Sequence, residues 1–342
     1  LSIKLAMLFF PALAFVITLP YMIANYRKYG SVNKLRTLIV YSFALYLLTV
    51  YLLVILPLPN RESIHSRYTD MLNLVPFAFV INFIKNSPFA LSNSTSLIMA
   101  LKHPSFYVPA FNVLMLIPFG IYMRYYFKCS FKKTMLLTAL LSLFFELTQL
   151  SGLYFIYSGP YRLGDIDDII QNTTGGCLGY LIGWFPVKIL PSRDRIDEKS
   201  LELGTRVSGI RVLLSLIIDI LIVFIPYSLS KTAIPLWPFI GGYFALIPLL
   251  NGKTFGSALL RFKIEFNGIK CARTIFRGVL LAVYFALIPQ GLLYLTNEFN
   301  KHADDLLYLC LLVITLLVLL LYALITIACV LLSKRLIFDR LV

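Results

Sequence analysis

The stretch RLGDIDDIIQNTTGGCLGYLIGW, from Arg162 to Trp184, joins a charged start to an apolar, glycine-rich continuation. The second half has the composition of a membrane span, whereas Asp165, Asp167 and Asp168 stand at its beginning. Carboxylates are costly within a bilayer, and those at the start of a helix either cap it or mark a site. The stretch therefore predicts a transmembrane helix with a cap or a site at its mouth.

The composition is that of an integral membrane protein. The chain has 342 residues, of which 59% are hydrophobic and 14% charged, and its mean hydropathy is +0.83. Soluble domains have about 45–50% apolar and about 25% charged residues. The basic excess lies in short loops between apolar runs, which favours membrane topology over nucleic-acid binding. Five scattered cysteines without a Cys/His cluster argue against a disulfide framework or a zinc site.

Apolar runs of about 20 residues predict membrane-spanning helices. The candidate spans are 5–25, 37–57, 108–127, 134–157, 167–190, 210–229, 234–250, 277–296 and 306–332. We therefore predict an all-α, polytopic transmembrane helix bundle of about nine spans. The first run lacks a small-residue cleavage site and is expected to be a span rather than a cleaved signal. The segment 57–107 is predicted to be re-entrant or interfacial, and the Pro- and Gly-rich span 234–250 kinked or broken.

The basic residues set the predicted orientation. An outer N-terminus and an inner C-terminus place most of the 31 Lys and Arg residues on the inner side. The most charged run separates five spans from four. We therefore predict a five-span module over 1–190, a charged cytoplasmic linker over 191–208, and a four-span module over 209–342.

Polar residues mark one face of the fourth span. Glu146 and Gln149 are three positions apart, so they share a helix face. An ionisable residue within a span is by default a candidate site. The alternative is that Glu146 fixes helix packing through a hydrogen bond.

A second polar face follows in the opening stretch. Asp165, Asp168, Asn172, Gly175 and Gly179 fall on one helical stripe. Below the acidic end, small residues repeat every four positions through Gly183, a pattern that lets another helix approach closely.

The two faces are expected to meet. If the helix of Glu146 packs on the glycine ridge, Glu146 and Gln149 approach the acidic stripe, and Arg162 supplies a counter-charge. Asp167 points elsewhere and is expected to cap the helix or hold the loop. Capping alone explains one or two carboxylates, but not a carboxylate within the span as well.

Four motifs in this half resemble the signatures of VanZ-like membrane proteins. In order, these are LNLVPF (Leu72–Phe77), NVLMLIPFG (Asn112–Gly120), FELTQL (Phe145–Leu150) and YRLGDIDDIIQNTTGGCLGY (Tyr161–Tyr180). The resemblance covers about residues 40–190. It implies a multi-pass protein of the bacterial cytoplasmic membrane and a link to resistance against the lipoglycopeptide teicoplanin. It implies no particular reaction.

The second half is similar to the RDD family over about 205–335. Arg211 and Asp219 in RVLLSLIIDILI match the family's polar pair, and NGKTFGSALLRFKI matches its cytoplasmic loop. Ser257 stands where that loop usually carries Lys, which weakens an anion-binding role. Asp219 is expected to pair with Arg211 or Arg273, or to serve an ion path.

These observations support several hypotheses about function. The first is binding or modification of an outer-leaflet lipid, a lipid-linked cell-wall precursor or a lipoglycopeptide. Arg162 would contact phosphate, and the carboxylates and the amides of Gln149 and Asn172 would bind sugar hydroxyls. In an enzyme, Glu146 or Asp168 would be the acid/base.

The other hypotheses come from different classes. One is an ion-coupled transporter that uses Glu146 and Asp219, and another is a non-catalytic envelope scaffold. No cofactor is expected, unless a divalent cation bridges the carboxylates to phosphate. The expected partners are membrane lipids, not nucleic acid.

Overall fold

The computed structural model describes residues 2–64, 66–88, 94–230, 234–263, 270–302 and 305–333. The chain divides into two compact units. Unit 1 comprises Leu1–Ile17 and Lys34–Asp197, and unit 2 comprises Thr18–Asn33 and Glu198–Val342. Both divisions fall within helices, α1 (Ser2–Tyr29) and α10 (Arg193–Gly204).

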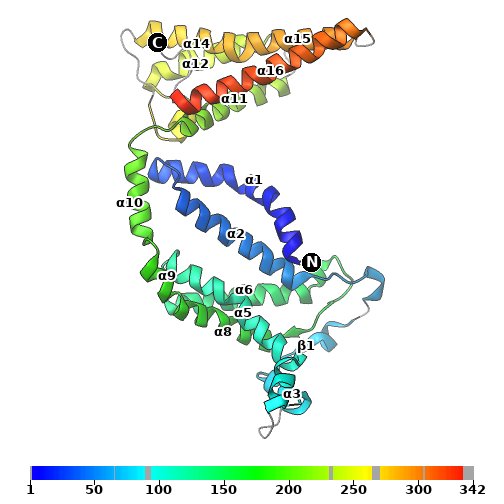
Figure 1. Cartoon of the computed structure of the whole chain (residues 1–342). Helices are drawn as coiled ribbons and strands as arrows, with labels where there is room; N and C mark the ends of the chain where they lie inside the picture. Colours follow the sequence, from blue (N-terminus) through cyan, green and yellow to red (C-terminus); the bar gives the residue numbers. More distant parts are fainter. Residues whose placement is uncertain are drawn as a thin grey trace. The chain divides into compact units, whose positions relative to one another are not determined.

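Unit 1 consists mainly of helices (Figure 1). Besides its part of α1 and α10, it contains α2 (Lys34–Ile55), η1 (Arg61–Ser63), η2 (Tyr68–Met71), β1 (Leu72–Asn73), α3 (Ala78–Asn86), α4 (Ser94–Leu101), α5 (Pro104–Tyr125), α6 (Phe131–Leu150), α7 (Gly152–Phe155), β2 (Gly164–Asp165), α8 (Ile166–Ile182) and α9 (Trp184–Ile189).

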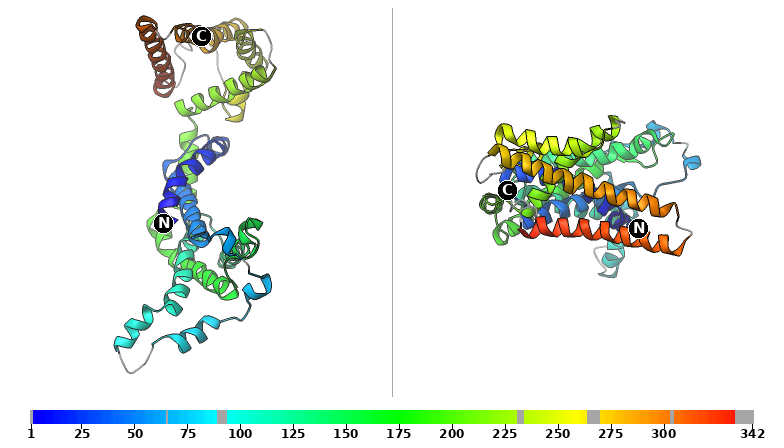
Figure 2. Two further views of the ribbon diagram at one scale, coloured as in Figure 1. Left: turned by 90° about the vertical axis from the view of Figure 1, so that its right-hand side faces the viewer. Right: turned by 90° about the horizontal axis from the view of Figure 1, so that it is seen from above.

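Unit 2 is built from helices that contact one another, among them α15 and α16, and Figure 2 shows them in orange and red in two further views. Its elements are α11 (Gly209–Ser230), α12 (Trp237–Asn251), α13 (Phe255–Leu259), α14 (Lys270–Ala282), the π-turn η3 (Val283–Leu287), α15 (Ile288–Asn300) and α16 (Leu306–Ser333). The segment predicted to be broken contains α12, one continuous helix with Pro248 inside it.

Within the described residues, seven helices are long and apolar enough to span a bilayer. They are Ser2–Tyr29, Lys34–Ile55, Pro104–Tyr125, Phe131–Leu150, Gly209–Ser230, Cys271–Asn300 and Leu306–Ser333. The protein is therefore a multi-pass membrane protein. The other two predicted spans contain the shorter helices α8 and α12, so the figure of nine spans and their orientation stay predictions.

Helix α8 packs most tightly against α5. A Cβ on Gly175 or Gly179 would lie 2.0 or 1.9 Å from a backbone oxygen of α5. On the opposite side of the contact, a Cβ on Gly120 would lie 2.0 Å from the carbonyl oxygen of Gly176. The glycines thus allow backbone-to-backbone contact, as the ridge predicted.

The partner on this ridge differs from the predicted one. We expected the helix of Glu146, α6, but Val113 and Ile117 of α5 lie against Gly175 and Gly179. Helix α6 covers the neighbouring face of α8, where a Cβ on Gly176 would meet the Thr138 side chain. Successive helical residues point about 100° apart, so α8 has small residues on two faces and accepts a helix on each.

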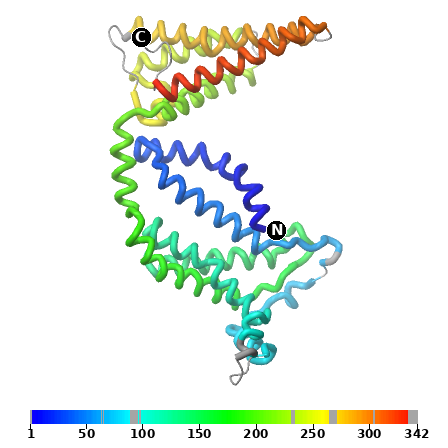
Figure 3. The backbone as a smooth tube through the Cα atoms, in the orientation of Figure 1, coloured from blue at the N-terminus to red at the C-terminus, as the bar shows by residue number. Residues whose placement is uncertain are grey.

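A long connection joins α2 to α5, and its path can be followed in Figure 3. It contains no membrane-length helix among its described residues. Its strand β1 pairs in parallel with β2, with Leu72 opposite Gly164 and Asn73 opposite Asp165. The all-α prediction did not anticipate this pair, which brings the connection to the start of α8.

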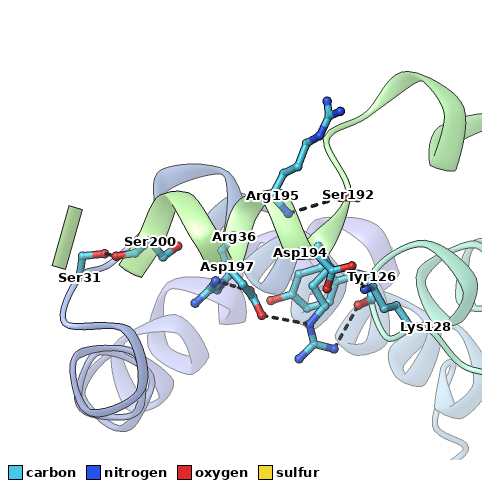
Figure 4. A network of polar contacts seen from close by, with 10 residues as sticks. Ser31, Arg36, Tyr126, Lys128, Ser192, Asp194, Arg195, Asp197 and Ser200 are labelled. Atoms are coloured by element: carbon cyan, nitrogen blue, oxygen red, sulfur yellow. Dashed lines mark hydrogen bonds and ion pairs between the residues drawn. The ribbon is translucent and has the colours of Figure 1, made fainter. Parts of the chain in front are cut away.

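Charged contacts tie the first half of α10 to the rest of unit 1 (Figure 4). Buried Arg36 and partly buried Arg193 form ion pairs with Asp197, and Lys128 pairs with Asp194. The predicted linker 191–208 is mostly helical, because α10 covers Arg193–Gly204. Arg193 also lies over the ring of Tyr126, 5.3 Å from its centroid.

Candidate functional site

Asp165 caps α8 and joins it to strand β1. Its Oδ1 accepts a hydrogen bond from the backbone N–H of Asp167 at 2.9 Å, which is the usual geometry of an N-cap. Its Oδ2 accepts from the Asn73 side-chain amide at 3.1 Å. The parallel pairing places these two residues opposite each other, so the side-chain bond follows from the register.

Asp167 holds the start of α3. Its side chain is 2% exposed, and its two oxygens accept from the backbone N–H groups of Phe77 and Phe79 at 2.6 and 2.9 Å. The first turn of α3 has no side-chain cap of its own, since its N-cap residue Phe77 supplies none. Asp167 therefore satisfies the free N–H groups of a neighbouring helix and holds the loop before it. We expected it to point away from Asp165 and Asp168, but it lines the same cavity as these two residues.

Asp168 faces the interface between α8 and α5. Its Oδ1 accepts from the Asn112 side-chain amide at 2.7 Å, and the same amide donates to Gln171 Oε1 at 2.9 Å. Its second oxygen has no hydrogen-bond donor among the described residues. Asp168 therefore keeps an acceptor available to a ligand.

Glu146 contacts the backbone of Asp165. Its side chain is 7% exposed, and its Oε2 accepts from the Asp165 backbone N–H at 3.0 Å. Asp165 and Asp168 act on it as like charges and Arg162 as the opposite charge. The structure thus brings Glu146 close to the acidic residues and shows it as an acceptor that fixes the β2 backbone.

Gln149 and Arg162 meet elsewhere, at the end of α2. The Gln149 amide and the Arg162 guanidinium both donate to the carbonyl oxygen of Val54, at 2.7 and 3.0 Å. A cation at a helix C-terminus is stabilised by the free carbonyl groups there. Arg162 is exposed and binds this helix end, whereas we predicted that it would contact a phosphate.

Asn172 lies one turn below Asp168, between α8 and α6. Its amide donates to Ser142 Oγ at 2.9 Å, and its buried Oδ1 has no hydrogen-bond partner in the described part of the chain. Ser142 in turn donates to the backbone oxygen of Asp168 at 3.4 Å. Asn172 therefore belongs to the helix interface below the acidic residues.

A polar cavity of about 270 Å³ opens at the acidic residues. Three carboxylates and three neutral polar side chains contribute to its wall: Asp165, Asp167, Asp168, Asn82, Ser105 and Gln171. Asn172, Glu146, Gln149 and Arg162 do not line it.

An apolar groove of about 440 Å³ adjoins this cavity. Residues of α3, α5 and α8 and the adjacent Phe77 line it, among them Phe77, Phe79, Phe83, Phe106, Val113 and Ile170. The cavity and the groove share Phe79, Ser105, Pro109 and Gln171. Among the described residues, no basic side chain lines either space.

The arrangement suits a molecule with a polar end and a hydrocarbon end. The cavity offers acceptor oxygens to hydroxyl or ammonium groups, and the groove offers aromatic and aliphatic surface. No group of three or more His, Cys, Asp or Glu side chains in the described part of the chain is placed to hold a metal ion.

The site lies within a part of the chain that matches a known family. A family model described as VanZ/LLP1 matches residues 43–187. This part of the chain is similar to that family, and we call residues 43–187 the VanZ-like domain. All residues that line the cavity and the groove lie within it. No curated protein and no solved structure matches the chain.

Several residues of the VanZ-like site were missed as candidates from the sequence. Asn73, Asn112 and Ser142 bond to the predicted residues Asp165, Asp168 and Asn172. The fourth, Gln171, accepts a hydrogen bond from Asn112. The sequence did contain a sign that two of them belong to the site, because Asn73 and Asn112 lie in two of the quoted motifs. Asn112 also puts an amide in the middle of a span, where a polar group needs a partner.

Outside the VanZ-like domain, Arg211 and Asp219 do not form an ion pair with each other. Arg211 donates to backbone oxygens that include Leu260 at 2.6 and 2.9 Å and Gly30 at 3.1 Å. Asp219 accepts from Tyr243 Oη and from the N–H of Gly256, both at 2.6 Å. The two residues therefore bind opposite ends of α13, which lies within the loop predicted from the sequence. Ile264, the last residue of that loop, lies outside the described residues.

Proposed function

We propose that the VanZ-like domain binds a membrane amphiphile. The polar head group lies in the carboxylate-lined cavity, and the hydrocarbon chain lies in the groove of α3, α5 and α8. The observation that carries this proposal is that the two spaces adjoin each other and share four wall residues. A polar wall alone would suit a soluble ligand, and an apolar groove alone would suit a lipid tail.

The proposed ligands are hydroxyl-rich amphiphiles. An outer-leaflet envelope lipid, a lipid-linked cell-wall precursor and a lipoglycopeptide such as teicoplanin all have this form. The resemblance to VanZ-like proteins supports a place in the bacterial cytoplasmic membrane and a link to teicoplanin resistance. Both are part of the proposal.

Asp168 is the residue proposed to contact the ligand directly. It lines the cavity and keeps one oxygen without a protein donor. Asp165 and Asp167 shape the wall, because their oxygens already accept bonds from Asn73 and from backbone N–H groups. Glu146 is a positioning residue for Asp165. This division of roles supports binding over catalysis, since it leaves a single available carboxylate.

The test is the amphiphile that purified protein retains. Mass spectrometry of lipids extracted from the protein should show a retained class that Asp168→Asn loses while its melting temperature is kept. Asp70→Asn removes a carboxylate outside the cavity and serves as the matched control. Ala110→Phe fills the groove and should reduce retention of long-chain species. Equal retention by all four proteins would refute the proposal.

The alternative of an ion-coupled transporter has less support. It would use Glu146 and Asp219, and both carboxylates accept hydrogen bonds from protein N–H or O–H groups. Ion-dependent flux in proteoliposomes that is lost in Glu146→Gln would favour it. For residues 209–342, the RDD-like assignment is likewise proposed, on the resemblance of the loop that Arg211 and Asp219 hold.

A further inference from the structure

The short element α7, which follows the end of α6, is a left-handed turn and not a right-handed helix. Four consecutive residues, Gly152 to Phe155, have positive φ angles of 62°, 53°, 59° and 66°. Glycine adopts this conformation without strain, but Leu153, Tyr154 and Phe155 place a Cβ close to the backbone there. A run of three such bulky residues persists only where surrounding contacts hold it.

The contacts that hold this turn are specific. Ser151 Oγ accepts from the Tyr154 backbone N–H at 3.1 Å, and the Ser151 carbonyl oxygen accepts from the Phe155 N–H at 2.9 Å. The Gly152 carbonyl oxygen then accepts from the Tyr157 N–H at 2.9 Å. A Cβ on Gly152 would lie 2.5 Å from the Gly159 oxygen, so the chain returns close to its starting point.

The turn presents apolar side chains outward. Tyr154, Phe155 and Ile156 are 50, 79 and 50% exposed. No charged residue occurs between Leu150 and Tyr161. In water, the exposed apolar side chains of this tip would be unfavourable.

Side-chain contacts fix the level of the tip at the ends of two spans. The Tyr154 hydroxyl lies 3.1 Å from the hydroxyl of Tyr51 and accepts from Thr148 Oγ1 at 3.2 Å. Tyr51 is near the end of α2, and Thr148 is near the end of α6. Both helices have the length of a membrane span. The ends of such helices lie at the level of the lipid head groups, where aromatic side chains are enriched.

We infer that the tip Leu153–Ile156 is a membrane-contact element that inserts Phe155 and Ile156 into the bilayer interface. The partner is the lipid surface itself. The left-handed turn keeps the two side chains in a fixed orientation, and Tyr154 anchors them at the helix ends. This contact is separate from the amphiphile cavity, since none of its residues lines the cavity or the groove.

Fluorescence quenching tests this inference. The full chain has two tryptophans, Trp184 and Trp237. With both replaced by Phe, Phe155→Trp provides a single probe at the tip. The protein is reconstituted into phosphatidylcholine vesicles with ordinary acyl chains or with chains brominated near the ester end. Brominated chains should remove roughly half of the emission or more, because an interfacial side chain lies near the upper acyl carbons. Acrylamide in the water should quench weakly.

A control and a second probe keep the experiment decisive. Leu201→Trp in the same background places the probe on the charged helix α10, where Leu201 is 54% exposed. It should respond to acrylamide and not to brominated lipid. If Phe155→Trp does not fold, Ile156→Trp replaces it with the same expected result. Strong acrylamide quenching without lipid quenching at the tip would overturn the inference, and so would protection from both quenchers, which would mean that protein covers the tip.

Discussion

Gly179→Ala tests the contact that holds the site together. The new Cβ would lie 1.9 Å from the Ile117 carbonyl oxygen, whereas ordinary contacts of this kind begin at 3.4 Å. Because the obstacle is backbone, α5 and α8 have to move apart by about 1.5 Å, and a close-packed interior does not absorb this elsewhere. Asn112, on the same helix as Ile117, would then lie about 4 Å from its acceptors, too far for a hydrogen bond.

Three contributions give the expected loss of folding free energy. Overpacking costs about 1–3 kcal/mol, and two lost hydrogen bonds cost about 1 kcal/mol each. The higher helix propensity of Ala returns up to about 1 kcal/mol. The net destabilisation is about 2–4 kcal/mol, which lowers the melting temperature by roughly 4–16 °C. The same displacement should reduce amphiphile retention, because Asn112 orients Asp168.

Thermal unfolding of the purified protein in detergent measures this effect. Gly242→Ala is the matched control, because it adds the same methyl group within a helix and has no atom within 4 Å of the new Cβ. Its melting temperature should stay unchanged or rise slightly. Gly179→Ala with the melting temperature of Gly242→Ala would refute the backbone contact between α5 and α8.

Three further changes test other parts of the structure. Leu153→Gly should raise stability by about 1 kcal/mol in thermal unfolding, because glycine has no Cβ penalty at a φ of 53°, and Leu153→Ala should give no such gain. Asp167→Asn should speed hydrogen exchange at residues 77–86 and lower the free energy of unfolding by about 1–3 kcal/mol, because an amide side chain has one acceptor oxygen for the two N–H groups of Phe77 and Phe79. The control Asp70→Asn should leave hydrogen exchange at these residues unaltered. Arg211→Lys should cost about 2–4 kcal/mol in unfolding, since an ammonium cannot reproduce the fork of bonds to several carbonyl groups; an unchanged melting temperature would show that these bonds contribute nothing.

The helices and their polar faces were largely predictable from the sequence. Runs of apolar residues locate the helices, because a bilayer requires about 20 such residues for a span. The four-residue spacing of Gly175 and Gly179 correctly predicted a close helix approach. Spacing along one helix is a local property, so it survives folding unchanged.

The identity of neighbouring elements was not predictable in the same way. Glycines on two faces of α8 leave two helices as candidates for one ridge, and only the packing of the whole unit assigns α5 to it. The pair of two-residue strands has too few residues to show a strand periodicity. Arg162 was placed with the acidic residues by charge, but the end of α2 offers it an acceptor as well.

The pairing of β1 with β2 has a consequence for biogenesis. Asn73 and its acceptor Asp165 are 92 positions apart, so this contact closes a long loop of chain. The ribosome releases α3 well before α8, and until α8 arrives Asp167 cannot cap the first turn of α3. The wall of the cavity is therefore completed only when α8 is in place. A chain interrupted before Gly164 would lack the partner strand of β1 and the carboxylate that holds the first turn of α3.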